Sequence, residues 1–191
     1  MLFIFVLFIL CCYFCFKDEF YQYVRKIAQY DEALGVLHWD LRTGAPAKTA
    51  AHRSGVIGML STERFRLSIS DEMKRYLDEL GAKKDQLNDT TIAMLREWGN
   101  EYERSVNIPV AEYEEYVRLT SEAESFWETA KDAADFVGFQ PYLEKIVDYK
   151  RKFAEYWGYD EHPYDSMLDA YEPGLTVSQL EPLFKELRSN L

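Results

Sequence analysis

Three histidines, His38, His52 and His162, are the residues of this chain best suited to bind a transition metal or transfer protons near neutral pH. A helix that holds zinc commonly places two histidines four residues apart, because residues at that spacing share one helix face. None of the three has a second histidine at that spacing, or a glutamate at a ligand-like helical spacing. The sequence therefore predicts no metal ligand and no catalytic residue. A zinc site assembled from the three distant histidines is the alternative left open.

Ordinary structural roles can account for these histidines. We interpret His38 as a helix-end residue bonded to the backbone, His52 as an exposed helical residue, and His162 as part of the turn before Pro163. Two pairs of glutamates could also suggest acid–base chemistry or a hard-cation site. Without a loop that gathers further oxygens, they are predicted to be solvated helix faces: Glu112 with Glu115, and Glu122 with Glu124.

A candidate binding site lies where a helix meets a loop rich in Gly and Pro. Trp39, Asp40 and Thr43 precede Gly44 and Pro46, and a helix end beside such a loop is a place where side chains can contact a peptide. These three residues are our candidates for a substrate groove. Local capping chemistry favours the alternative, in which Asp40 and Thr43 satisfy backbone donors in the turn while Trp39 packs.

Two later segments could contribute to a groove or to a contact surface in a larger fold. They are Tyr164-Asp165 and Tyr171-Glu172-Pro173-Gly174. A Pro-Gly turn flanked by tyrosine is more often architecture, so we assign no catalytic role to either segment. The many tyrosines and tryptophans fall at helical spacings and are interpreted as packing residues, not as a cofactor site.

The elements that position these residues are predicted to be helices. Steps of three and four residues, or multiples of them, place an apolar stripe on a helix over residues 17–38: Phe20, Val24, Ile27, Leu34 and Leu37. Gly44 and Pro46 then break the helix and predict a loop over residues 40–48. No segment alternates with a period of two, and no internal linker is found. We predict an all-α fold, an elongated multi-helix array, in one domain over residues 17–191.

Similar stripes and capping residues predict the other helices. Ser70 is expected to cap a helix that ends at Gly81, and Asn88 or Asp89 to cap the next one. The last helix could begin at Thr176 or at Ser178, and Ser178 is favoured because it keeps Pro182 nearer the helix start. Further helices are predicted over residues 49–60, 63–67, 109–131, 142–158 and 167–171.

Charge and cysteine content limit the partners. The formal net charge of −11 argues against binding to phosphate backbones, so nucleic acid is not expected as a partner. All three cysteines lie within the first sixteen residues, so the globular part is predicted to depend on no disulfide.

Residues 1–16 form an apolar leader without a charged side chain. A secretory signal would carry basic residues before the apolar run and a small-residue cleavage site after it. A helix of this length covers ~24 Å, whereas the hydrocarbon core of a membrane is ~30 Å thick. We favour an adventitious upstream start, with a membrane anchor and a signal as alternatives, and expect membrane contact only through this leader.

Several short blocks follow one another in a characteristic order. They are the run Leu37-His38-Trp39-Asp40 with Thr43 and Pro46, then Ile108-Pro109, Thr120-Ser121, Trp127, Asp135-Phe136, Gly158-Tyr159, Pro163-Tyr164-Asp165, Leu168-Asp169 and Tyr171-Glu172-Pro173-Gly174. In order and spacing these blocks resemble the carboxypeptidase Taq family, the thermostable zinc metallocarboxypeptidases. The resemblance covers residues 17–191.

The resemblance implies a cytoplasmic, homodimeric enzyme that uses zinc to remove single residues from peptide C-termini. Zinc would be held by an H-E-x-x-H helix and a further Glu, which the family places beyond the region matched here. We therefore expect the N-terminal scaffold and groove wall of such a peptidase, truncated before the zinc-binding motif, with no bound zinc and inactive alone. The alternative is a stand-alone, non-enzymatic helical binding module, tethered to a membrane through residues 1–16.

Overall fold

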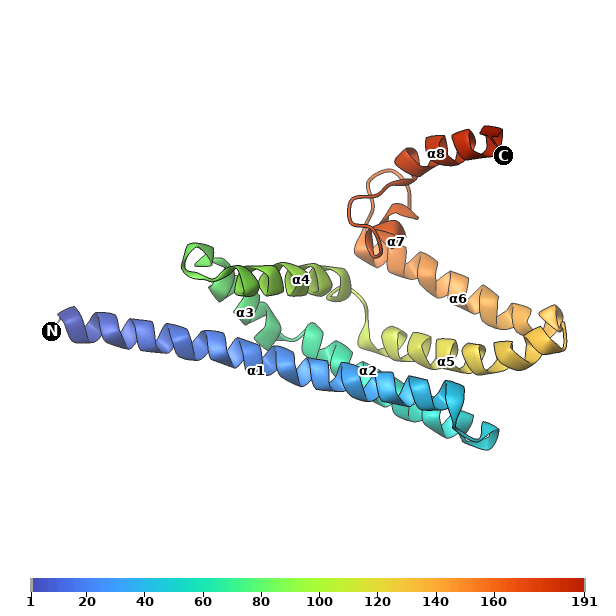
Figure 1. The fold of residues 1–191 in the computed structure, drawn as a ribbon, viewed down its shortest axis with the longest axis horizontal. Helices are drawn as coiled ribbons and strands as arrows, with labels where there is room; N and C mark the ends of the chain where they lie inside the picture. The colour runs from blue at the N-terminus through green and yellow to red at the C-terminus, as the bar shows by residue number, and fades with distance from the viewer. Residues whose placement is uncertain (1, 191) are drawn as a thin grey trace.

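Helices make up all the regular structure that the computed structural model describes, which is the backbone of residues 2–190 and the side chains of residues 15–46, 48, 49 and 51–190. This confirms the all-α prediction (Figure 1). In chain order the elements are α1 (Leu2–Thr43), the 3₁₀ turn η1 (Ala47–Thr49), α2 (Ala50–Ser68), α3 (Asp71–Gly81), the 3₁₀ turn η2 (Lys84–Gln86), α4 (Asp89–Ser105), α5 (Val110–Asp132), α6 (Phe136–Trp157), α7 (Asp165–Asp169) and α8 (Val177–Asn190).

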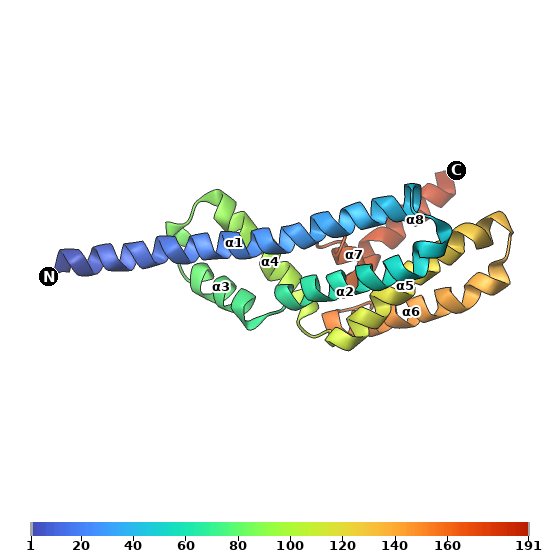
Figure 2. The same ribbon diagram turned by 90° about the horizontal axis from the view of Figure 1, so that it is seen from below.

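The helices form an elongated array built from hairpins. α1 runs along most of the long axis, and α2 returns beside it (Figures 1 and 2). α2 also packs against α5, which pairs with α6, while α3 pairs with α4. α7 lies at the end of α6, and α8 stands apart from the other helices in Figure 1.

Two separate apolar clusters stabilise the array. The first joins three helices through buried side chains: Phe20, Tyr23 and Ile27 of α1, Met73, Tyr76 and Leu80 of α3, and Leu95 of α4. The second is centred on three buried residues: Phe65 of α2, Ile108 in the segment between α4 and α5, and Phe153 of α6. In it the rings of Phe65 and Tyr113 stack with centroids 3.9 Å apart. The core is therefore divided along the molecule.

α1 is longer at its C-terminal end than the sequence predicts. It continues through Asp40 to Thr43, so the prediction of a loop from residue 40 is wrong. Gly44 and Ala45 donate backbone hydrogen bonds to the carbonyl oxygen of Asp40, at 3.0 and 2.8 Å, and so close the helix. The helix ends at the Gly and Pro residues themselves, because nothing before them removes a backbone donor.

α2 is a single helix where two short ones were predicted. The expected break at Ser61-Thr62 does not occur, because both side chains are buried within α2, where the Thr62 hydroxyl donates to the carbonyl oxygen of Gly58 at 2.8 Å. The buried face consequently keeps one helical register along the element. Ile57 lies on this buried face with 1% exposure, whereas Met59 is 58% exposed.

The predicted caps of α3 and α4 are confirmed. The Ser70 hydroxyl accepts a hydrogen bond from the backbone N–H of Met73 at 3.0 Å, and α3 ends at Gly81. The Asn88 side-chain oxygen accepts from the N–H of Thr91 at 2.8 Å, which selects Asn88 as the cap of α4.

The predicted cap of α8 is wrong. The helix begins at Val177, and the backbone N–H of Thr176 donates to the Gln179 side chain at 3.2 Å. Thr176 and Gln179 therefore occupy the capping positions, and Pro182 lies inside the helix. A tertiary contact fixes this start, because the Val177 N–H donates to the carboxylate of Asp165 at 2.7 Å.

The predictions about the leader fall on residues 1–16, and the side chains of residues 1–14 lie outside those that the structure describes. An adventitious start, an anchor and a signal therefore all remain predictions. Within the described part of the chain, no helix combines the length and the apolar character needed to cross a membrane.

Candidate functional site

The three histidines are far from forming a metal centre. His38 lies inside α1, not at its end as predicted, and His52 is exposed on α2 as predicted. His162 lies in the turn before Pro163, where its ring nitrogen Nδ1 accepts a hydrogen bond from the N–H of Tyr164 at 3.1 Å. Among the described residues, no group of three or more His, Cys, Asp or Glu side chains could hold a metal ion. These residues do not fit a resident zinc ion, so we assign them no metal-dependent step.

The structure brings Trp39, Asp40 and Thr43 together on the last turn of α1. Asp40 forms an ion pair with Arg53 of α2 at 2.6 Å, and the Thr43 hydroxyl donates to the carbonyl oxygen of Trp39 at 2.7 Å. The Trp39 side chain is 72% exposed, so the interpretation that it packs is wrong. The Asp40 side chain pairs with Arg53 and not with the backbone N–H groups of the turn, so this part of the interpretation is also wrong.

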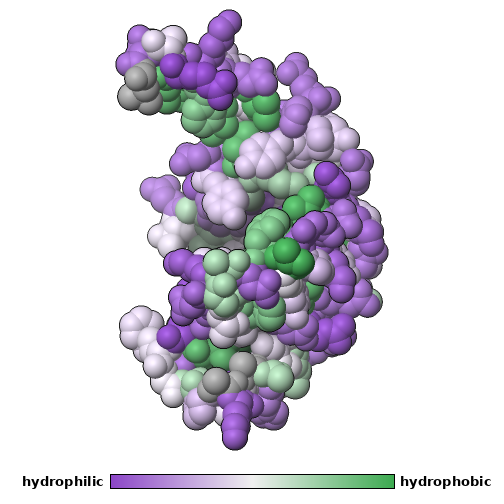
Figure 3. All heavy atoms as spheres, turned by 90° about the vertical axis from the view of Figure 1, so that its right-hand side faces the viewer, coloured by the Kyte–Doolittle hydropathy of each residue, from purple (hydrophilic) through white to green (hydrophobic). Residues whose placement is uncertain are grey.

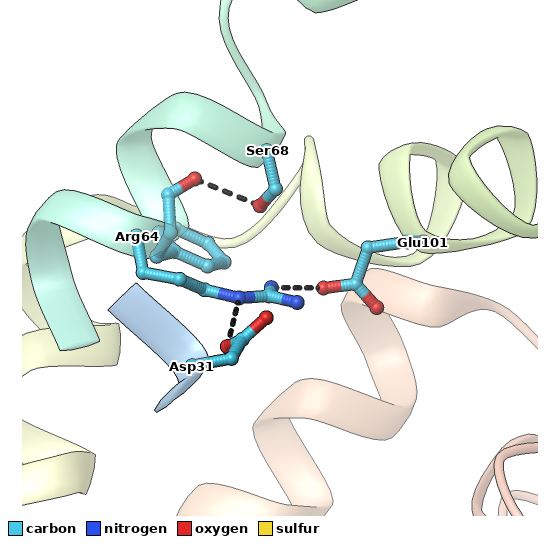
Figure 4. Close-up of polar contacts among 5 residues, drawn as sticks. Asp31, Arg64, Ser68 and Glu101 are labelled. Carbon is cyan, nitrogen blue, oxygen red and sulfur yellow. Dashed lines mark hydrogen bonds and ion pairs between the residues drawn. The ribbon is translucent and has the colours of Figure 1, made fainter. Parts of the chain in front are cut away.

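Arg64 of α2 is the centre of an ion-pair network between three helices (Figure 4). Its Nε donates to Asp31 of α1 at 3.1 Å, and its Nη1 donates to Glu101 of α4 at 2.6 Å. The guanidinium also lies over the ring of Trp98, 5.7 Å from its centroid. Only 20% of the Arg64 side chain is exposed, so the network closes the space between α1, α2 and α4.

Electrostatics keep Arg64 charged in this partly buried place. Burial lowers the pKa of the guanidinium, but the hydrogen bond and charge of Glu101, with those of Asp31, outweigh it and raise the pKa. Sequence reasoning missed this network, since its three members come from distant segments. The network has no nucleophile or general base aligned for a reaction, so we interpret it as a stabilising contact.

A cleft of about 790 Å³ lies between α4, the end of α6, α7 and the start of α8. Arg104 of α4 lines this cleft and donates to the Asp169 carboxylate at 2.9 Å. Asp160, Glu161 and Asp165 add negative charge to its walls. A peptide carboxylate would be repelled by this lining, so the cleft is a poor site for the C-terminus of a substrate.

Two aspartates of α7 organise the loops around this cleft. Asp165 accepts from the backbone N–H of His162 at 3.3 Å and of Val177 at 2.7 Å. Asp169 accepts from the N–H of Gly174 at 2.8 Å as well as from Arg104. The architectural interpretation of the Tyr164-Asp165 segment and the Pro-Gly turn therefore agrees with these contacts. Two aspartates four residues apart in a turn-rich segment were the signal available in the sequence.

Glutamates and tyrosines join α5 to α6. The Tyr149 hydroxyl donates to Glu115 at 2.6 Å, and the Tyr156 hydroxyl donates to Glu112 at 3.2 Å. Glu115 is exposed, as predicted for a solvated helix face, whereas Glu112 is only partly exposed, and both also accept hydrogen bonds from α6 that were not predicted. The pKa of Tyr149 is raised to about 12. The hydrogen bond to Glu115 is the largest cause, followed by burial and by the charge of Glu115. Sequence periodicity could not reveal these pairs, which depend on how α5 and α6 align.

The helical arrangement places the chain in a class of metallocarboxypeptidases. It superposes on the crystal structure of BsuCP with a TM-score of 0.89 and 45% sequence identity, covering 91% of this chain and 35% of that one. Carboxypeptidase 1 of Bacillus subtilis is 45% identical over 173 residues, which are 91% of this chain and 34% of the relative. Thermostable carboxypeptidase 1 of Pyrococcus furiosus is 35% identical, covering 87% of this chain and 33% of the relative.

The family model for carboxypeptidase Taq (M32) metallopeptidases matches residues 19–191. The chain therefore belongs to the M32 metallopeptidase family, which confirms the resemblance found in its sequence. It spans about a third of the length of the relatives it matches.

Proposed function

We propose that this chain forms the N-terminal scaffold and part of the groove wall of a zinc-dependent metallocarboxypeptidase, which releases single residues from peptide C-termini. The observation that carries the proposal is the agreement of its helices with a third of BsuCP at a TM-score of 0.89. Zinc and the general base would belong to the other two thirds of such an enzyme, because the described residues offer no metal-binding group. The chain alone is then expected to release no amino acids.

Trp39, Asp40 and Thr43 are proposed to contribute to the substrate groove. The support is the 72% exposure of the Trp39 side chain and the ion pair of its neighbour Asp40 with Arg53, which joins α1 to α2. An exposed indole on a fixed helix end offers a rigid apolar face to a peptide at little cost in conformational entropy.

A chimaera tests the proposed function. The whole chain would replace the matched third of B. subtilis carboxypeptidase 1, and amino acids released from an unblocked peptide would be measured with and without a zinc chelator. We expect chelator-sensitive release by the chimaera and none by the chain alone. Trp39→Ala should raise the KM of the chimaera several-fold, whereas Trp127→Ala, at 45% exposure on α5, should leave it unchanged.

Two results would contradict the proposal. One is a chimaera that folds and binds zinc but releases nothing, and the other is the chain alone with stoichiometric zinc and peptidase activity. The first result would favour the non-enzymatic binding module, and the second would show that this chain holds a complete peptidase site of its own. Family resemblance also leads us to propose a cytoplasmic location and a homodimer, and sedimentation velocity of the chimaera tests the dimer.

A further inference from the structure

α8 carries an apolar stripe that the rest of the chain leaves uncovered. Leu180, Leu183, Phe184 and Leu187 follow one face of the helix at steps of three and four residues. Leu183, Phe184 and Leu187 are 50%, 60% and 46% exposed. No residue of α8 is buried, which distinguishes it from α3, whose similar stripe buries Met73 and Leu80.

The start of α8 is nevertheless held firmly. The N–H of Val177 donates to Asp165 at 2.7 Å, and that of Thr176 donates to Gln179. The helix has 14 residues, a length at which isolated helices are marginal in water. A helix that is anchored at one end and apolar along one face needs a further surface to pack against.

The molecule has the shape of a crescent, and α8 lies at one end of it (Figure 3). In Figure 3 the molecule is hollowed on one side, and hydrophobic atoms of the uppermost lobe, which is α8, lie on the side turned toward the rest of the chain. α8 stands apart from the other helices in Figure 1, and none of its residues is buried. The described part of the chain therefore leaves this face of α8 uncovered.

We propose that the Leu183/Phe184/Leu187 face of α8 is the surface on which the remaining two thirds of an M32 peptidase docks, through an apolar helix face of its own. The length of the relatives identifies this occupant, since the chain covers only 34% of B. subtilis carboxypeptidase 1. The inference rests on the proposed function and adds to it the contact that joins scaffold and catalytic part.

Amide hydrogen exchange over residues 177–190 tests the proposal in the isolated chain and in the chimaera. We expect fast exchange of α8 in the isolated chain and roughly 100-fold slower exchange in the chimaera, because packing protects amides. Phe184→Glu should abolish this slowing in the chimaera. Lys185→Glu, outside the apolar stripe, should keep the slow exchange, although it changes the net charge more than Phe184→Glu does.

The isolated chain provides a second test that does not depend on folding of the chimaera. Phe184→Glu and Lys185→Glu should both leave its thermal midpoint almost unchanged, since both side chains are exposed in the described part of the chain. A lowered midpoint for Phe184→Glu alone would overturn the proposal. So would a concentration-dependent dimer of the isolated chain with a protected α8, which would identify a second copy as the occupant.

Exchange and activity separate the two proposals. A protected α8 in a chimaera that releases no amino acids would defeat the proposed function and support the docking surface. Release of amino acids by a chimaera whose α8 is unprotected would support the proposed function and defeat the docking surface. A chimaera that does not fold, when the B. subtilis enzyme made alongside does, would count against the docking surface.

Discussion

The hydroxyl of Ser121 on α5 donates a hydrogen bond to the hydroxyl of Ser54 on α2 at 2.8 Å. Both side chains are buried, at 6% and 2% exposure. Small polar residues at this crossing let the two helices approach closely, while Ser54 accepts the hydrogen bond of the buried Ser121 hydroxyl. This contact, at the interface of the central helix pair, predicts a particular pattern of mutational effects.

Ser54→Ala should destabilise the chain by about 1 kcal/mol, because it leaves the buried Ser121 hydroxyl without its partner. The double variant Ser54→Ala/Ser121→Ala should be nearly neutral, since both polar groups are then gone and the shape is almost kept. Urea unfolding followed by circular dichroism measures both. A double variant that costs as much as the two single changes added together would show that the hydrogen bond is unimportant.

Phe65→Ala should destabilise the chain by about 3 kcal/mol or more, as is usual when a large side chain is removed from a packed core. Phe65 is 2% exposed and stacks on Tyr113. Phe136→Ala is the control, because Phe136 is 62% exposed. Equal urea midpoints for the two variants would mean that the second apolar cluster contributes little to stability.

Arg64→Met should cost about 2 kcal/mol, because it removes two charge-assisted hydrogen bonds while keeping the apolar stem. Asp31 and Glu101 remain partly exposed, which limits the loss. Arg66→Met removes the ion pair of Arg66 with Glu63 at the surface and should change stability by less than about 0.5 kcal/mol. Comparison of urea midpoints tests the difference, and a larger effect of Arg66→Met would refute it.

Tyr149 should make stability depend on alkaline pH. Its pKa is raised from 10.0 to about 12 in the folded chain, so the folded state holds the proton more tightly than the unfolded state. The stabilisation is present in full below about pH 10 and is lost as the pH rises to about 12. The stability difference between wild type and Tyr149→Phe should shrink over this range. Tyr171→Phe, at 84% exposure, is the control, and a constant difference for Tyr149→Phe would contradict the prediction.

Asp165→Ala should loosen the segment between α6 and α8 without unfolding the chain. The variant loses the acceptors for the N–H groups of His162 and Val177, while the two apolar clusters are untouched. We expect faster proteolytic cleavage within residues 158–177 and an almost unchanged thermal midpoint. Asp160→Ala in the same loop should cleave at the wild-type rate. Wild-type cleavage of Asp165→Ala would mean that the loop is held by other contacts.

Local chemistry made most helices predictable from sequence. The caps at Ser70 and Asn88 depend on residues within three positions, and their geometry is as predicted. The errors arose where tertiary contacts decided between local alternatives. Ser61-Thr62 resembles a helix break in sequence, yet both residues are buried within α2, and the start of α8 is chosen by Asp165.

The candidate site was less predictable than the fold. Family membership could be recognised from blocks such as Leu37-His38-Trp39-Asp40 because these follow the chain order. The network of Arg64 with Asp31 and Glu101 could not, since it joins three helices and neither charge nor spacing predicts how those helices cross. The exposure of Trp39 was missed for a related reason, because burial depends on neighbours that periodicity does not identify.

α2 contributes to both apolar clusters through side chains only two positions apart. Leu67 packs against the first cluster and Phe65 belongs to the second. Any rotation of α2 that improves one of these contacts must disturb the other. Substitutions in the two clusters should therefore be energetically coupled despite their separation, and a change in volume near Phe65 will be best tolerated when Leu67 or its neighbours change with it.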